Sequence, residues 1–230
     1  MNETTDQLSA AEIAARLSGS PEERAALIRA GAEEGVAEAQ AVLGQMLLDE
    51  GRAGEGFAWF NKAAAQGHLM ALNMVGRCYD LGWGVAVDKA RAAECFRIAA
   101  DRGLEWGMYN YATSLTLGAG VAEDKGAALG WFEKAAAMGN AKAINYIGSF
   151  HEDGWVVAQD MAKAAEFYAR AAEGGDFRGA FNHARMLAGA GRMDEARTWI
   201  VRCFETATPD FTEKARAFLA ASPWPELRAC

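Results

Sequence analysis

The sequence predicts an all-α protein, a solenoid of about six helix-turn-helix repeats with capping helices at its N- and C-terminal ends. Apolar residues recur along the chain at spacings of three and four, which is the period of an amphipathic helix. Alanine is abundant whereas valine, isoleucine and threonine are sparse, and this balance favours helices over sheets. A 36-residue pattern also recurs in phase, and a period of that length is typical of stacked helical units.

The first part of the chain is expected to form N-terminal capping helices with a degenerate repeat, over residues 1–38. The stretch SPEE carries the signals of a helix start. Ser20 is placed to cap the helix, Pro21 occupies its first position, and Glu23 lies where its carboxylate bonds back to the cap. A short-loop repeat follows at residues 39–70.

Three full repeats occupy residues 71–106, 107–142 and 143–178. Each copy carries a valine, an aspartate and an aromatic residue at matching places. These are Val85, Val121 and Val157; Asp88, Asp124 and Asp160; and Phe96, Phe132 and Tyr168. So many coincidences at one period indicate a single structural unit repeated in register.

Within each repeat, particular residues are expected to pack, end and cap its two helices. The first helix carries a small residue that lets the second helix approach closely, found as Gly44, Gly76, Ala112, Gly148 and Ala184. A glycine ends the first helix, as Gly82, Gly118 and Gly154. The aspartate then caps the second helix, where a short carboxylate accepts from free N–H groups.

The C-terminal part is predicted to contain a degenerate short-loop repeat at residues 179–205. A C-terminal capping helix and tail follow at residues 206–230, with Asp210 expected to begin the helix. We expect this helix to shield the last repeat, because a solenoid needs a polar outer face at its end.

Composition narrows the classes of partner. The 230-residue chain has a net charge of −8, and residues 1–70 hold eleven acidic and five basic residues. Because it lacks clusters of lysine and arginine, we expect no binding to nucleic acid and no insertion into a membrane. Without a signal peptide or a long apolar run, the given sequence fits a cytoplasmic protein.

Four cysteines without CxxC pairing fit reduced thiols of the core, the alternative being a bridge or metal site.

The corner sequences carry a family resemblance. GWGVAVD, GAGVAED and GWVVAQD occupy residues 82–88, 118–124 and 154–160. Together with the paired alanines and closing glycine of each copy, they resemble the Sel1-like repeat, a relative of the tetratricopeptide repeat, over roughly residues 39–205. The resemblance implies a right-handed superhelix and an adaptor or scaffold role in protein assemblies. Secreted members bridge the two helices of a repeat with disulfides, and this chain lacks their regular cysteine pattern.

The resemblance also implies a concave groove lined by the first helices. Its expected lining consists of amides, hydroxyls, charges and a few aromatic residues: Gln45, Asp49, Asn73, Arg77, Asp80, Tyr109, Thr113, Thr116, Asn145, Ser149, Glu152, Asp153, Phe181 and Arg185. Asn73 and Asn145 suit the clamping of an extended backbone, since a carboxamide offers both donor and acceptor. The alternative is an ordinary solvated helix face.

Two loop tryptophans are a second candidate for partner contact. Trp83 and Trp155 occupy the same corner position two repeats apart. Aromatic residues are common interface anchors, so either tryptophan is a possible anchor for a partner. The alternative is that each packs across its own helix corner.

No catalytic constellation emerges from the sequence. The histidines His68, His151 and His183 occupy unrelated repeat positions and lack metal-binding spacing. His151 beside Glu152 and Asp153 fits a solvated helix end better than a metal site. The GxG at the corner recurs at 36-residue intervals, which favours a helix corner over a phosphate loop. We therefore expect no enzyme activity, no cofactor and no metal.

The functional hypothesis is a non-enzymatic scaffold or adaptor that binds a peptide segment or protein domain in the concave groove. One alternative is a toxin-neutralising or regulatory inhibitor that blocks a target with its wider surface. A further alternative is a hydrolase-type enzyme, because folds can host unexpected sites. The sequence identifies neither the partner nor the oligomeric state.

Overall fold

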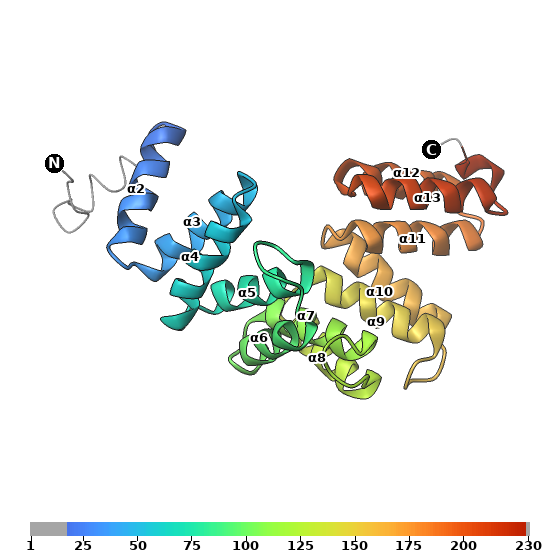
Figure 1. Ribbon diagram of the computed structural model, residues 1–230. Helices are drawn as coiled ribbons and strands as arrows, with labels where there is room; N and C mark the ends of the chain where they lie inside the picture. The colour runs from blue at the N-terminus through green and yellow to red at the C-terminus, as the bar shows by residue number, and fades with distance from the viewer. Residues whose placement is uncertain (1–17, 229–230) are drawn as a thin grey trace. The chain divides into compact units, whose positions relative to one another are not determined.

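The computed structural model describes residues 18–228, which contain twelve α-helices, α2 to α13, one 3-10 helix and no strand (Figure 1). The expected capping region before residue 18, and Cys230, lie outside the described residues. The chain divides into two compact units, Met1–Glu123 and Asp124–Cys230, and each is described by itself. Within each, nearly all consecutive helices pack against one another, as in a solenoid.

From residue 18 onward, the first unit contains six helices of 13 residues each: α2 (Pro21–Glu33), α3 (Ala37–Asp49), α4 (Ala53–Ala65), α5 (Leu69–Leu81), α6 (Lys89–Asp101) and α7 (Glu105–Leu117). Besides the consecutive contacts, α5 also touches α7. The first helices of these adjacent repeats therefore lie side by side.

The second unit contains α8 (Lys125–Ala137), α9 (Ala141–Asp153), α10 (Met161–Glu173), α11 (Phe177–Gly189), α12 (Met193–Thr206), α13 (Pro209–Ala221) and the 3-10 helix η2 (Pro225–Leu227). First helices α9 and α11 again touch. Leu219 of α13 and Leu227 of η2 join the apolar cluster formed by Leu187, Ile200 and Cys203. The final helix thus shields the last repeat, as predicted.

Helix starts and stops follow the sequence signals closely. Gly82, Gly118 and Gly154 end their helices in the left-handed conformation, at φ of 76°, 64° and 71°. The three repeated aspartates cap the second helices through their carboxylates, as Asp88, Asp124 and Asp160. Ser20 and Glu23 form the predicted capping box. These local signals need no tertiary context.

One predicted helix start was wrong. The N-cap of α13 is Thr208, whose hydroxyl accepts a hydrogen bond from the amide of Phe211 at 3.4 Å. Pro209 follows as the first helical residue, because proline has the right φ and lacks a donor that would otherwise be unsatisfied. Asp210 lies in the first turn, where its charge faces the positive end of the helix dipole.

Close packing within a repeat depends on the small residue of the first helix. A Cβ at Gly76 would lie 2.6 Å from the ring of Phe96, and one at Gly148 would lie 2.7 Å from that of Tyr168. Both rings are almost fully buried. The aromatic residue of the second helix therefore rests directly on the backbone of the first.

The corner loop differs between the units. A Cβ at Gly84 would overlap the backbone of Ala53, and one at Gly120 would overlap that of Lys89, so both loops rest on the start of the preceding second helix. Val156 stands at the equivalent position in the second unit, with φ of 53°. A β-branched residue is strained in this region. Its side chain is 60% exposed.

Candidate functional site

The first helices carry every predicted groove residue. We call the surface formed by α3, α5 and α7 in the first unit, and by α9 and α11 in the second, the first-helix face of each unit. The predicted positions alternate along it with small and apolar core residues. The two units arrange these positions in different ways.

In the first unit, a hollow of about 580 Å³ lies between α3 and α5. Gln45 and Asp49, both predicted, line it, and the amide of Gln45 donates to the Asp49 carboxylate at 2.8 Å. Its remaining lining was not predicted and is largely apolar: Ala41, Val42, Met46, Phe60, Met70, Ala71 and Met74, with Glu38 and His68 at the edge. Val42 and Met70 are exposed although they are apolar, whereas Met74 is buried.

His68 connects the edge of this hollow to the helix start. Its Nδ1 accepts a hydrogen bond from the backbone amide of Ala71 at 3.1 Å, which caps α5. The proton of the neutral ring is therefore on Nε2, which donates to the Glu38 carboxylate at 2.8 Å. Sequence reasoning gave His68 no role, although its place directly before a predicted helix was a signal for a cap.

Two asparagine pairs join neighbouring first helices. Asn110 donates to the Oδ1 of Asn73 at 2.8 Å, and Asn182 donates to the Oδ1 of Asn145 at 2.9 Å. Asn73 and Asn145 are only 3% and 6% exposed, so these predicted clamps already use an acceptor in helix packing. The half-buried partners, Asn110 and Asn182, present more surface to solvent.

In the second unit, a polar network brings together three predicted residues. Arg185 forms a bidentate ion pair with Glu152, with contacts of 2.9 to 3.2 Å. The hydroxyl of Tyr168 donates to Glu152 at 2.6 Å and lies 3.1 Å from that of Ser149. Tyr168 was missed as a network member, although it is the one tyrosine at a position that holds phenylalanine in Phe60, Phe96 and Phe132.

The network sets the protonation of its members. Burial alone would raise the pKa of Glu152, but the hydrogen bonds from Arg185 and Tyr168 outweigh it and hold that pKa below its usual range. Burial and the neighbouring Glu152 carboxylate raise the pKa of Tyr168. The pair therefore consists of a charged carboxylate and a neutral phenol.

Most of the other predicted groove residues already contact neighbouring groups of the same unit. Arg77 packs its guanidinium over the Trp83 ring, 4.7 Å from the centroid, and burial lowers the pKa of Arg77. Asp80 accepts from Lys89 at 2.6 Å. Thr113 donates to the carbonyl of Tyr109 at 2.9 Å. Asp153 is exposed at the end of α9.

Two further predicted groove residues are buried, as Asn73 and Asn145 are. Thr116 is buried and its hydroxyl donates to the carbonyl of Ala112 one turn back in its own helix, at 2.8 Å. Phe181 is buried because α13 covers it, with Phe211 and Phe218 packed edge-on against its ring.

The loop tryptophans pack against the core of their own corner. Trp83 lies against the cluster that contains Val75 and Cys78. Trp155 meets Phe150 edge-on at 5.5 Å, and Lys125 lies over its ring at 4.3 Å. Both indoles are half-buried.

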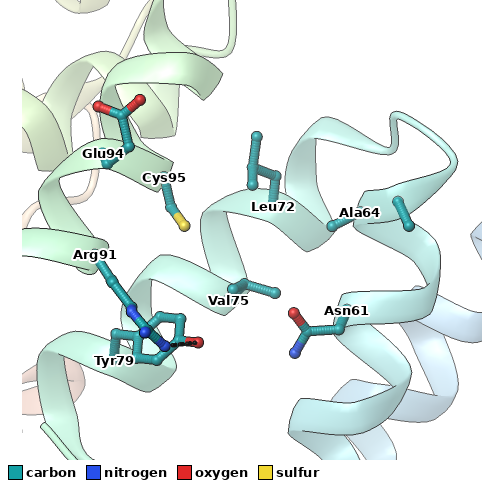
Figure 2. A pocket seen from close by; sticks show the side chains of 9 residues that line it. Asn61, Ala64, Leu72, Val75, Tyr79, Arg91, Glu94 and Cys95 are labelled. Atoms are coloured by element: carbon teal, nitrogen blue, oxygen red, sulfur yellow. Dashed lines mark hydrogen bonds between the residues drawn. The ribbon is translucent and has the colours of Figure 1, made fainter. Parts of the chain in front are cut away.

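A second hollow, of about 410 Å³, lies among α4, α5 and α6 (Figure 2). Leu72 and Val75 line it from α5, while Cys95 faces it from α6. Arg91 donates to the Tyr79 hydroxyl at 3.3 Å and packs on its ring, as Figure 2 shows. Burial and the neighbouring Glu94 raise the pKa of Cys95, so its thiol is protonated at neutral pH.

Among the described residues, the buried cysteines are protonated thiols at neutral pH, and two histidines pack against aromatic rings. Burial raises the pKa of Cys78 and of Cys203 to about 11. His151 stacks on Phe167 and His183 packs against Trp199. Residues 18–228 contain no group of three His, Cys, Asp or Glu side chains that could hold a metal ion.

Sequence comparison identifies the repeat. A family model described as the Sel1 repeat matches residues 37–68, 69–104, 107–140 and 141–176, which together exceed half of the chain. The chain belongs to the Sel1 repeat family. Sel1 repeats form a helical scaffold, and stacked helical repeats of this kind create extended binding surfaces for proteins. The comparison with curated proteins found no match to this sequence.

Solved structures show the same fold. A protective antigen present in uropathogenic Escherichia coli strains is 26% identical, with a TM-score of 0.70 over 95% of this chain and 50% of that chain. A Sel1 repeat protein from Oxalobacter formigenes is 23% identical, with a TM-score of 0.68 over 86% of this chain and 60% of that one. This chain thus spans only about half to three fifths of the length of these two relatives.

An immunity protein from Pseudomonas aeruginosa is also similar. It is 18% identical, with a TM-score of 0.59 over 84% of this chain and 74% of that chain. At this identity the likeness concerns the Sel1 fold alone.

In the part of the chain that the structure describes, no helix has the length and apolar character needed to cross a membrane.

Proposed function

We propose that the protein is a non-enzymatic adaptor that binds a segment of a protein partner on its first-helix face. The observation that carries the proposal is the hollow between α3 and α5, which is largely apolar and open to solvent. Ligand sites are typically concave and mostly apolar, with a few polar groups at the edge. The volume of about 580 Å³ is within the usual range for such sites.

The methionines of the hollow suit a binding surface. Met46, Met70 and Met74 line it from two helices, and Met70 is 39% exposed. Methionine side chains are flexible and polarisable, so they adapt to irregular apolar partners. Exposed apolar side chains gathered around a concave surface are a feature of interaction sites.

The second unit supports a different role for its polar residues. Glu152, Tyr168 and Arg185 already satisfy one another, and each of the charged side chains is 22% exposed. A ligand would have to break a charge-assisted network before it could use either charge, which is unfavourable in a partly desolvated site. We therefore assign the principal contact to the first unit, with Gln45 and Asp49 as its predicted members.

The test begins with affinity capture of a partner on the full chain and its identification by mass spectrometry. Binding of the purified partner is then measured by isothermal titration calorimetry. Met70→Asp and Val42→Asp should each weaken binding by tenfold or more, because they place a carboxylate in an apolar contact, at a cost of about 1–3 kcal/mol.

Val201→Asp is the matched control, since Val201 is an exposed apolar residue of α12, in the other unit. It should leave the affinity unchanged, and all three variants should retain the circular dichroism of the parent. Unchanged binding by Met70→Asp and Val42→Asp would remove the hollow as the site. An equal loss in the control would attribute the effect to folding.

A further inference from the structure

We infer that the hollow between α3 and α5 selects a segment with an apolar centre flanked on both sides by lysine or arginine. This inference rests on the proposed function and specifies the chemistry of the partner. The inference is based on two carboxylates at opposite ends of the hollow and on the apolar surface between them. It also uses the fact that neither carboxylate pairs with a lysine or arginine in the part of the chain that the structure describes.

Both carboxylates belong to α3 and are held in place by neighbours. Glu38 stands near the start of the helix and accepts from the Nε2 of His68, which is itself fixed as the cap of α5. Asp49 is the last residue of the helix and accepts from Gln45. Each carboxylate has a second oxygen that makes no hydrogen bond within residues 18–228. Both acids are thus oriented and still able to accept.

Within residues 18–228, neither acid pairs with a lysine or arginine. Glu38 accepts from the neutral ring of His68, and Asp49 accepts from the amide of Gln45. Nearby acids on the same helices differ. Glu50 pairs with Arg29 and Arg52, and Asp80 pairs with Lys89. The two acids that line the hollow are therefore the ones left for an external cation.

The charges lie at the two ends of the apolar stretch. Asp49 follows Glu38 by eleven positions along α3, and at a rise of about 1.5 Å per residue their backbone positions lie about 16 Å apart along the helix axis. Val42 and Met46 lie between them on α3, with Met70 and Met74 facing from α5. Within the described chain, no lysine or arginine lines the hollow.

A complementary segment follows from this order of groups. Its centre needs apolar side chains to cover the methionines, and its flanks need cations to meet Glu38 and Asp49. Flanking charges of this kind mainly set specificity and association rate, while the apolar centre supplies most of the affinity. An acidic flank would instead bring like charges together.

The first experiment displays short random peptides and selects them on the full chain. Enriched peptides should carry apolar residues flanked by lysine or arginine. A selected peptide is then synthesised and its affinity measured by fluorescence anisotropy at low and high salt. The double variant Glu38→Gln with Asp49→Asn keeps both acceptors for His68 and Gln45. It should bind about three- to tenfold more weakly at low salt and show a flatter salt dependence, as for exposed ion pairs.

The matched control is Glu133→Gln with Glu166→Gln, which removes two exposed acids from second helices and changes net charge equally. It should leave the affinity unchanged. The reversed variant Glu38→Lys with Asp49→Lys should enrich acidic peptides from the same library. Enrichment of acidic or purely apolar peptides on the parent, or of none, would overturn the inference.

The experiments distinguish a failure of the hollow as the binding site from a failure of its preference for basic flanks. If Met70→Asp abolishes binding of the captured partner while selected peptides lack basic residues, the hollow stands as the site and its charge preference falls. If basic peptides are selected but bind Met70→Asp as well as the parent, they occupy another surface. In that case the inference and the assignment of the hollow fall together.

Discussion

The first-helix faces of the two units share a plan but differ in what they leave unsatisfied. In both, an asparagine pair joins adjacent first helices, with donor–acceptor distances of 2.8 and 2.9 Å. In the second unit, Arg185 and Glu152 then neutralise each other. In the first, Glu38 and Asp49 meet no lysine or arginine among the described residues, and they stand beside exposed apolar side chains.

This difference separates a surface that stabilises the fold from one that is suited to binding. A polar network that is fully satisfied rigidifies its surroundings, and it costs free energy to open. A surface with unpaired charge and exposed apolar area gains free energy when a complementary partner covers it. First helices of the same repeat family therefore carry a satisfied polar network in one unit and an apolar hollow with two acids in the other.

The largest expected effect follows from breaking the ion pair of the second unit. Arg185→Ala leaves the Glu152 carboxylate half-buried without its cation and should lower the free energy of unfolding by about 2 kcal/mol. Gln45→Ala, at the equivalent position of the first unit, should change it by less than about 0.5 kcal/mol. Urea denaturation followed by circular dichroism measures both. Equal effects of the two changes would contradict the contrast between the faces.

The corner loops provide the next test. Val156→Gly should stabilise the chain by about 1 kcal/mol, because glycine removes the strain of a β-branched residue at positive φ. Gly84→Ala should destabilise it, since the added Cβ would overlap the backbone of Ala53. The melting temperature in thermal unfolding should rise for Val156→Gly and fall for Gly84→Ala. A lower melting temperature for Val156→Gly would show that the valine contributes packing that outweighs its strain.

A smaller effect concerns pH. The pKa of Glu152 is lower in the folded state than in the unfolded state, so its contribution to stability is present above the unfolded pKa. That contribution is lost as pH falls through the folded pKa. Tyr168→Phe removes one donor to Glu152 and should cost about 1 kcal/mol at neutral pH. Stability curves measured from neutral to acidic pH should show a smaller acid-induced loss for the variant, and parallel curves would exclude the coupling.

The smallest expected effect on stability belongs to the hollow. Met70→Asp should change the free energy of unfolding by less than about 0.5 kcal/mol, because the side chain is 39% exposed and lies at the surface. Hydrogen exchange across α3 and α5 should remain as in the parent. Faster exchange there would indicate that Met70 supports the fold rather than a contact with a partner.

Much of the fold was predictable because its signals are local. Gly82, Gly118 and Gly154 end the helices that precede them. The repeated aspartates cap the helices that directly follow them. Both signals act within a few residues along the chain. Asp210 was misassigned although Pro209 carried the better signal, since proline favours the first helical position. Gly76 and Phe96 could be paired because the repeat brings them into register.

The site was less predictable because it depends on contacts between helices. Met46, Met70 and Met74 look like core residues in the sequence, and their shared hollow exists only once α3 and α5 lie together. Phe181 was assigned to a groove that α13 covers. Periodicity identifies the face of a helix, but it does not show which part of that face another element occupies.

The asparagine pairs have a consequence for how such a chain can grow or shrink. Asn73 and Asn110 recur as Asn145 and Asn182, displaced by two repeats, whereas the intermediate copy carries Tyr109 and Tyr146 in the corresponding places. The unit of exchange is therefore a pair of repeats. Inserting or deleting 72 residues preserves the partner of every asparagine, while a 36-residue change sets an amide opposite an aromatic ring. Engineered or natural length variants should favour even numbers of repeats.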